Sequence, residues 1–137
     1  MYKISYKYNL LPGDRLIHPI AGYPGAKHHS VFLGEDAFGV EWVSENHKVK
    51  GAQIVTIQSY FDEYGQFEKV LPFEGNQQQL QFAVKRAFSE AGKTYNLITN
   101  NCEHHANYVQ NGYPESKQVR NVFFALLGVF ALSVLAE

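Results

Sequence analysis

The stretch Asn100-Asn101-Cys102-Glu103-His104-His105 contains the single cysteine of this 137-residue chain and reads as the start of a helix. Asparagine is a favourable N-cap residue, and the small or apolar positions Cys102, Ala106 and Val109 recur at helical spacing until Gly112. We therefore expect Cys102 in the first helical turn. Backbone N–H groups and the positive end of the helix dipole favour a thiolate there.

A cysteine nucleophile needs a base, and the candidate histidines lie far upstream, in Lys27-His28-His29-Ser30-Val31-Phe32-Leu33-Gly34. The β-branched and aromatic residues followed by glycine predict a strand. Neighbouring strand residues face opposite ways, so only one of His28 and His29 can point at Cys102. The histidine precedes the cysteine, which is the reverse of the papain order and indicates a circularly permuted version of that layout.

The boxes His28-His29-Ser30-Val31-Phe32-Leu33-Gly34 and Asn101-Cys102-Glu103-His104 resemble those of the lecithin:retinol acyltransferase-like (H-box/NC-box) family. Tyr95-Asn96-Leu97 and Ser116-Lys117-Gln118-Val119-Arg120 are similar to its phospholipase A/acyltransferase branch. The resemblance implies a permuted papain-like, NlpC-type catalytic domain over residues 1–121. It also implies a thiol acyltransferase or phospholipase-like hydrolase that acts on a lipid or related ester or amide through a thioester acyl-enzyme.

The resemblance places the base at His28 and the nucleophile at Cys102. A third residue should accept the other imidazole N–H, and in much of the family it is a histidine on the next strand. Counting from the histidine box, that position falls at Glu41 or one residue before it, and only Glu41 is polar. We therefore expect Glu41 to orient His28, with His47 or Asn46 as substitutes.

Other interpretations use the same residues. A free cysteine is often buried and inert, and six histidines with one cysteine could ligate zinc. The adjacent pairs His28-His29 and His104-His105 lack the spacing of a zinc site, so we expect neither metal nor cofactor. By resemblance, Glu103 and His104 hold the site together, and His105 replaces an aromatic residue. Alternative functions are an NlpC-type amidase or cysteine peptidase, and a non-catalytic interaction protein.

Composition limits the number of domains, the kind of partner and the location that we expect. A chain of this length that is 45% hydrophobic builds one core and hence one domain. A formal net charge of −1 argues against nucleic-acid binding. One cysteine forms no internal disulfide, and the first seven residues are too polar for a secretory signal, so we expect a reducing, cytoplasmic location.

Periodicity predicts an α+β domain with a small antiparallel sheet packed against helices. Strands are expected at residues 14–20, 27–34, 38–43, 52–58 and 67–73, a short helical turn capped by Ser59 at 60–63, and a longer helix at 76–91. Leu80, Ala83, Val84 and Ala87 belong to an apolar stripe that should cover the sheet.

The last segment of the chain poses a separate question. Val122 to Ala136 is fifteen residues without charge, and it resembles the hydrophobic helix that anchors the phospholipase A/acyltransferase proteins in membranes. We expect a C-terminal hydrophobic helix over residues 122–137. Fifteen helical residues span roughly 22 Å, less than the ~30 Å hydrocarbon core. The segment therefore predicts a membrane-surface attachment, a helix packed in the protein, or a homo-oligomer contact.

Overall fold

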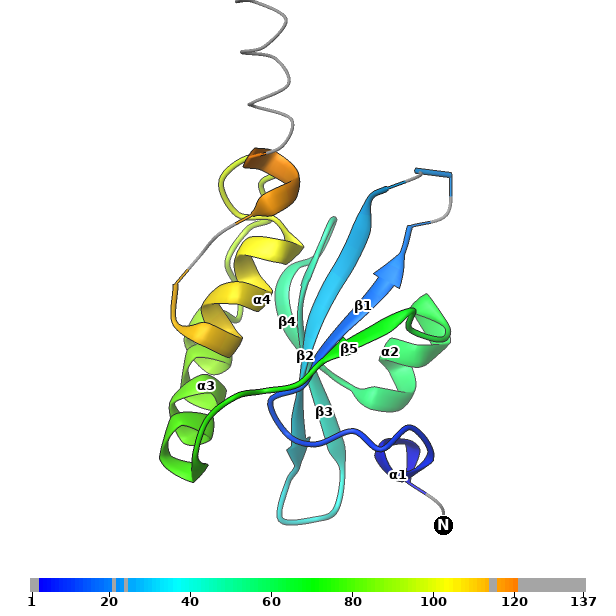
Figure 1. Ribbon diagram of the computed structural model, residues 1–137, viewed down its shortest axis with the longest axis vertical. Coiled ribbons are helices and arrows are strands. Elements are labelled where there is room, and N and C mark those ends of the chain that lie inside the picture. Colours follow the sequence, from blue (N-terminus) through cyan, green and yellow to red (C-terminus); the bar gives the residue numbers. More distant parts are fainter. Residues whose placement is uncertain (1–2, 21, 24, 114–115, 121–137) are drawn as a thin grey trace, which may run out of the picture.

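A computed structural model describes residues 3–20, 22–23, 25–113 and 116–120 (Figure 1). Five antiparallel strands form one sheet with the order β4-β3-β2-β1-β5. The elements are α1 (Ile4–Lys7), β1 (Arg15–Pro19), β2 (Lys27–Glu35), β3 (Glu41–His47), β4 (Gly51–Thr56), α2 (Ile57–Tyr64), β5 (Lys69–Leu71), α3 (Gln77–Glu90) and α4 (Cys102–Asn111). The expected α+β class with a small antiparallel sheet is confirmed.

Helices cover both faces of the sheet, with α1 and α2 on one side and α3 and α4 on the other (Figure 1). The alternation of β2 decides which residue meets which layer. Phe32 joins a buried cluster with Ile57 and Tyr60 of α2. Its neighbour Val31 joins a second cluster with residues of α3 and α4. The sheet is therefore the middle layer of three, buried from both sides.

Pairing between β2 and β3 leaves one end of β2 open. The register begins at Ser30 opposite Glu45 and continues through Val31 and Phe32, with an irregularity before Gly34. Residues 27–29 pair with β1 instead, Lys27 lying opposite Pro19. The strand's first three residues thus have a neighbour on one side only, and other parts of the chain can reach them from the β3 side.

The two longer helices begin and end close to where the sequence indicates. Asn76 caps α3 and Asn101 caps α4, in both cases through a reciprocal capping box. Gly112 ends α4 in the left-handed conformation, at φ 88°, which glycine adopts without steric cost.

Several boundaries differ from the expected ones. The third strand begins and ends later than residues 38–43, and β4 ends at Thr56, whose side chain caps α2 in place of the expected Ser59. Helix α1 was not predicted. The expected C-terminal helix at 122–137 lies outside the described residues. In the part of the chain that is described, no helix is long and apolar enough to span a bilayer.

Candidate active site

Cys102 is the first residue of α4 and is buried. The Asn101 side chain accepts hydrogen bonds from the backbone N–H groups of Glu103 and His104, each at 3.0 Å. Nδ1 of His104 accepts the N–H of Asn101 at 3.1 Å. The cap thus uses the next two N–H groups and not that of Cys102, which as the first of the helix has no intrahelical acceptor. The sulfur and this N–H lie together at the positive end of the helix.

The open end of β2 brings His28 to this sulfur. Cys102 Sγ lies 3.4 Å from the carbonyl oxygen of Lys27, and a hydrogen bond joins the Cys102 and His28 side chains. Burial lowers the pKa of His28, but its interactions with Cys102 and Glu45 outweigh burial and raise that pKa to about 9. At neutral pH a charged imidazolium therefore lies beside the sulfur.

Glu45 is the carboxylate on the other side of the ring. Oε1 of Glu45 lies 3.2 Å from Nε2 of His28, which makes an ion pair between the two buried side chains. Oε1 also accepts the hydroxyl of Tyr64 at 2.7 Å, and Oε2 accepts Nε2 of Gln53 at 3.1 Å. Burial raises the pKa of Glu45, but the contacts with His28 and Tyr64 lower it overall. The carboxylate is thus ionised although fully buried.

Glu41, the expected orienting residue, lies elsewhere. It pairs with Glu35, seven residues beyond His28 on β2, which is about 23 Å of strand at ~3.3 Å per residue. Its Oε1 accepts the backbone N–H of Ser5 at 3.3 Å and so holds α1. The structure therefore does not bring Glu41 to His28, and Glu45 occupies the place expected for it.

The two substitutes have other partners as well. His47 contacts Glu63 at 2.7 Å through Nε2, and its Nδ1 accepts two backbone N–H groups of the β3–β4 turn. Asn46 donates to the carbonyl of Asn100 at 2.7 Å. His47 therefore shapes a turn, whereas Asn46 fixes the residues that lead into Cys102.

Tyr64 is a site residue that sequence reasoning missed. Its ring stacks on that of His28, with centroids 4.1 Å apart and planes 12° apart, while its hydroxyl bonds to Glu45. It holds both partners of the ion pair at once. The available signal was the spacing of Tyr60 and Tyr64, which puts both rings on one face of α2.

Gln118 fills the position that β3 leaves open beside Lys27. Its Oε1 accepts the Lys27 N–H at 3.0 Å, and its Nε2 lies 3.5 Å from the Lys27 carbonyl that Cys102 also contacts. The backbone N–H of Gln118 donates to Glu103 at 2.9 Å. These bonds hold residues 116–120 as a wall next to the cysteine.

Two further buried histidines, His29 and His105, have structural partners. His29 points to the α4 side, where its Nε2 lies 3.7 Å from Oε2 of Glu103. A hydrogen bond of 2.7 Å joins His105 to Ser44 within the core. Burial lowers the pKa of each histidine to about 4, so both rings are neutral at pH 7. His105 thus packs in the interior where the resemblance led us to expect an aromatic ring.

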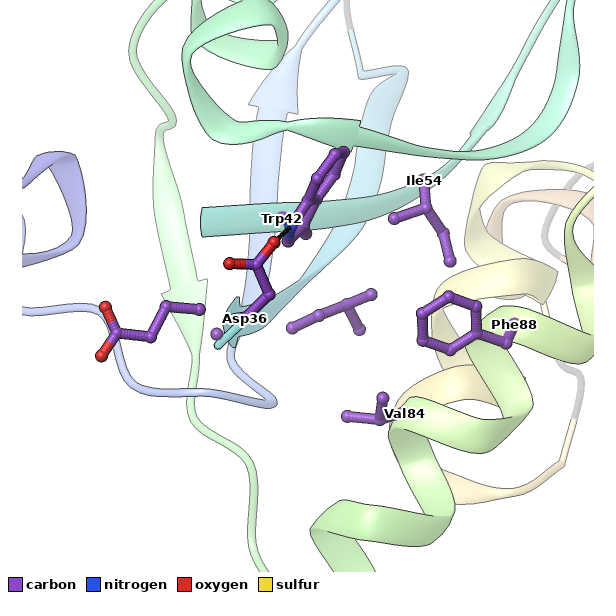
Figure 2. Close-up of a pocket in the computed structure, with 8 residues that line it drawn as sticks. Asp36, Trp42, Ile54, Val84 and Phe88 are labelled. Atoms are coloured by element: carbon purple, nitrogen blue, oxygen red, sulfur yellow. Dashed lines mark hydrogen bonds between the residues drawn. The ribbon is translucent and has the colours of Figure 1, made fainter. Parts of the chain in front are cut away.

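A cavity of about 560 Å³ lies away from these residues, between α3 and the opposite end of the sheet (Figure 2). Figure 2 shows Val84 and Phe88 of α3 facing Ile54 and Trp42 across it. Of its two acidic residues, Asp36 accepts the Trp42 indole N–H at 2.9 Å and Glu35 pairs with Lys3. The buried histidine–carboxylate pair and the cysteine lie elsewhere, at the start of α4. The described residues hold no His/Cys/Asp/Glu cluster suited to a metal ion.

The fold is α+β, and its candidate site consists of a cysteine, a charged histidine and a buried carboxylate that lie next to one another in space. No family model and no curated protein matches the chain. An assignment of function therefore depends on the geometry around Cys102 and on the sequence boxes that supply it.

Proposed function

We propose that this protein is a cysteine-dependent acyl hydrolase or acyltransferase. In this proposal Cys102 is the nucleophile, His28 the general acid and base, and Glu45 the residue that orients His28. The observation that carries it is the imidazolium of His28 held between the Cys102 sulfur and the fully buried Glu45 carboxylate. A structural cysteine does not require that arrangement, whereas a thiolate nucleophile does.

The reaction would run in two halves. The thiolate of Cys102 attacks the acyl carbonyl carbon, and the carbonyl electron pair moves to oxygen, close to the Cys102 backbone N–H. When the tetrahedral intermediate collapses, His28 gives its proton to the leaving alcohol or amine and a thioester remains on sulfur. Water or an acceptor then loses a proton to His28 and attacks the thioester, which returns Cys102 to the thiolate.

Glu45 contributes by fixing one ring orientation. Its contacts with Tyr64 and Gln53 hold the carboxylate, and the stacked Tyr64 ring restrains the imidazole of His28. A preorganised pair loses little energy to reorientation during the reaction. The sequence predicted that Glu41 orients His28. In our proposal Glu45 has that role instead.

The substrate class follows from the sequence boxes. Their resemblance to lecithin:retinol acyltransferase-like proteins supports phospholipid acyl groups as the substrate. The strand with His28 precedes the helix with Cys102, and that helix packs on the sheet, which supports a permuted papain-like, NlpC-type arrangement. A cytoplasmic location with attachment at a membrane surface, and self-association through residues 122–136, stay predictions of the sequence.

A product analysis tests the proposal. The full chain is incubated with phosphatidylcholine vesicles, and mass spectrometry follows free fatty acid and an acyl adduct on Cys102. We expect both products, and Cys102→Ser should abolish both. Cleavage of γ-glutamyl or cell-wall peptides without lipid products would establish the amidase alternative. A folded protein that acts on neither class would be an interaction protein.

A further inference from the structure

Four chain segments lie together at the end of the molecule where α4 begins with Cys102 (Figure 1). They are the described residues 20, 22–23 and 25–27 together with residues 47–51, 92–101 and 116–120, which we call the rim. Figure 1 places the β1–β2 connection, the β3–β4 turn, the segment before α4 and residues 116–120 at the end opposite the β2–β3 turn.

Contacts between the segments join the four of them into one surface. The Lys48 ammonium lies 5.9 Å from the ring centre of Tyr23. The Ala52 N–H donates to the carbonyl of Lys93 at 2.8 Å, and a Cβ on Gly51 would lie only 2.4 Å from that oxygen. Gln118 binds both backbone groups of Lys27. The rim is therefore continuous and not a set of separate loops.

Apolar side chains project from three of these segments. Val49 is 85% exposed and Leu97 67% exposed, and Tyr23 and Ile98 are similarly uncovered. These residues occupy turns and loops and do not complete a core stripe. Apolar side chains of this kind are stabilised when they leave water for a lipid interface.

The charge of the rim has one sign. Its segments contain Lys27, Lys48, Lys50, Lys93, Lys117 and Arg120 and no aspartate or glutamate. Glu68 pairs with Lys27 and Glu90 with Lys93. Lys48, Lys50 and Lys117 have no carboxylate partner among residues 3–20, 22–23, 25–113 and 116–120.

The β2–β3 turn at the opposite end has a different charge pattern, although Lys3 pairs with Glu35 there. Residues 35–41, which make the β2–β3 turn, hold three carboxylates and no cation. Phe38 is 92% exposed in this turn among carboxylates, whereas the exposed apolar side chains of the rim lie among its cations. A surface that combines apolar tips with cations fits an anionic bilayer.

We propose that the rim docks on an anionic lipid membrane and so turns the Cys102 end of the molecule toward it. A membrane is the expected partner for two reasons: the charged residues of the rim are all cations, and the chain continues from the rim into an uncharged stretch. The last described residue, Arg120, lies in the rim, and a stretch of fifteen uncharged residues follows almost at once. The inference rests on the proposed function, because docking here would bring phospholipid carbonyls to the nucleophile.

Tryptophan probes test which end meets the bilayer. In a Trp42→Phe background of the full chain, Leu97→Trp places a probe in the rim and Phe38→Trp a matched probe at the acidic end. Both are mixed with phosphatidylcholine vesicles that contain about 30% phosphatidylserine, with brominated acyl chains as quencher. We expect a blue shift and quenching for the rim probe and neither change for the other.

Three outcomes would overturn the proposal. Vesicle binding with both probes unquenched would assign attachment to residues beyond Arg120 alone. Quenching of the Phe38→Trp probe alone would reverse the orientation. A rim probe that responds to no vesicle but shifts when a purified protein partner is added would make the rim a protein interface.

A charge variant separates docking from catalysis. Lys48→Gln with Lys50→Gln should weaken binding to the anionic vesicles by about tenfold or more, whereas Lys7→Gln with Lys85→Gln should leave it within about twofold. Both pairs should hydrolyse a short-chain, water-soluble ester equally fast. Equal vesicle binding by the two pairs would contradict docking. Loss of ester hydrolysis in Cys102→Ser tests the nucleophile and needs no membrane.

Discussion

At the scale of single residues, the proposed mechanism requires that Glu45 keeps the His28 imidazole protonated. Glu45→Gln keeps the shape and removes the negative charge, so His28 should lose much of its proton at pH 7 and the thiolate its counter-ion. Because Cys102 is the only cysteine, iodoacetamide reports on it alone. We expect alkylation at pH 7 to slow by about tenfold.

Glu41→Gln is the matched control, since it makes the same change on the same strand away from His28. Its alkylation rate should stay within about twofold of the wild-type rate. Slowing by Glu41→Gln, with Glu45→Gln unchanged, would show that the carboxylates have been assigned the wrong way round.

The buried histidines predict how stability depends on pH. The pKa of His28 is raised to about 9, so its contribution is complete below about 6.5 and is lost as pH rises through 9. A shift of that size corresponds to about 3 kcal/mol. Burial lowers the pKa values of His18, His29 and His105 to about 4, so stability also falls as pH drops from 6.5 toward 4.

Urea unfolding from pH 4 to 10 measures this directly. The midpoint should be highest near pH 6.5 to 7, and His28→Asn should remove most of the decline on the alkaline side. A wild-type midpoint that keeps rising to pH 9 would mean that His28 is not charged in the folded protein.

At the scale of elements, the two capping boxes offer a comparison within one chain. Asn76→Ala and Asn101→Ala each remove a cap, and each should cost about 1 kcal/mol of unfolding free energy. Asn101 also donates to the carbonyl of Leu97 and to Ser116, so its loss should additionally shift the start of α4.

Only Asn101→Ala should therefore slow alkylation of Cys102, whereas Asn76→Ala should lower thermal stability and leave alkylation unchanged. Asn101→Asp, which preserves the cap acceptor, should restore part of the rate. Equal alkylation rates in all of these variants would show that the cap does not position the sulfur.

Elements also show what the sequence could predict. The start of α4 at Cys102 and the strand of His28 follow from local signals: an N-cap, helical spacing and β-branched residues. The partner of His28 does not follow from local signals, because strand pairing is non-local. In an antiparallel pair the start of β2 meets the end of β3, and the sequence placed that strand too early to include Glu45.

The contacts of Tyr64 and Gln118 with β2 could not be predicted for the same reason, although the spacing of Tyr60 and Tyr64 puts their rings on one face of a helix. Tyr64 meets His28 only because α2 folds back over β2, and Gln118 meets Lys27 only because residues 28 and 29 do not pair with β3. Tertiary contacts of this kind leave no period in the sequence. The one local hint for Glu45 was its position two residues after Val43, which puts both side chains on the same face of a strand.

At the scale of the whole molecule, the two core clusters found among the described residues, with their packed neighbours, lie between Ile4 and Val109. A chain that ends at Arg120 should therefore keep its fold and melt within a few degrees of the full chain. Its binding to phosphatidylcholine vesicles should fall, while the rim should preserve measurable binding to anionic ones. An unfolded truncated chain would mean that residues beyond Arg120 belong to the core.

The most direct test of the central claim is the rate at which an acyl adduct forms on the protein. Intact mass spectrometry follows the reaction with a soluble activated ester in the wild type, His28→Ala and His29→Ala. We predict one acyl group on Cys102, formed about 100-fold or more slowly in His28→Ala and at close to the wild-type rate in His29→Ala. A folded His28→Ala protein that acylates as fast as the wild type would contradict the account.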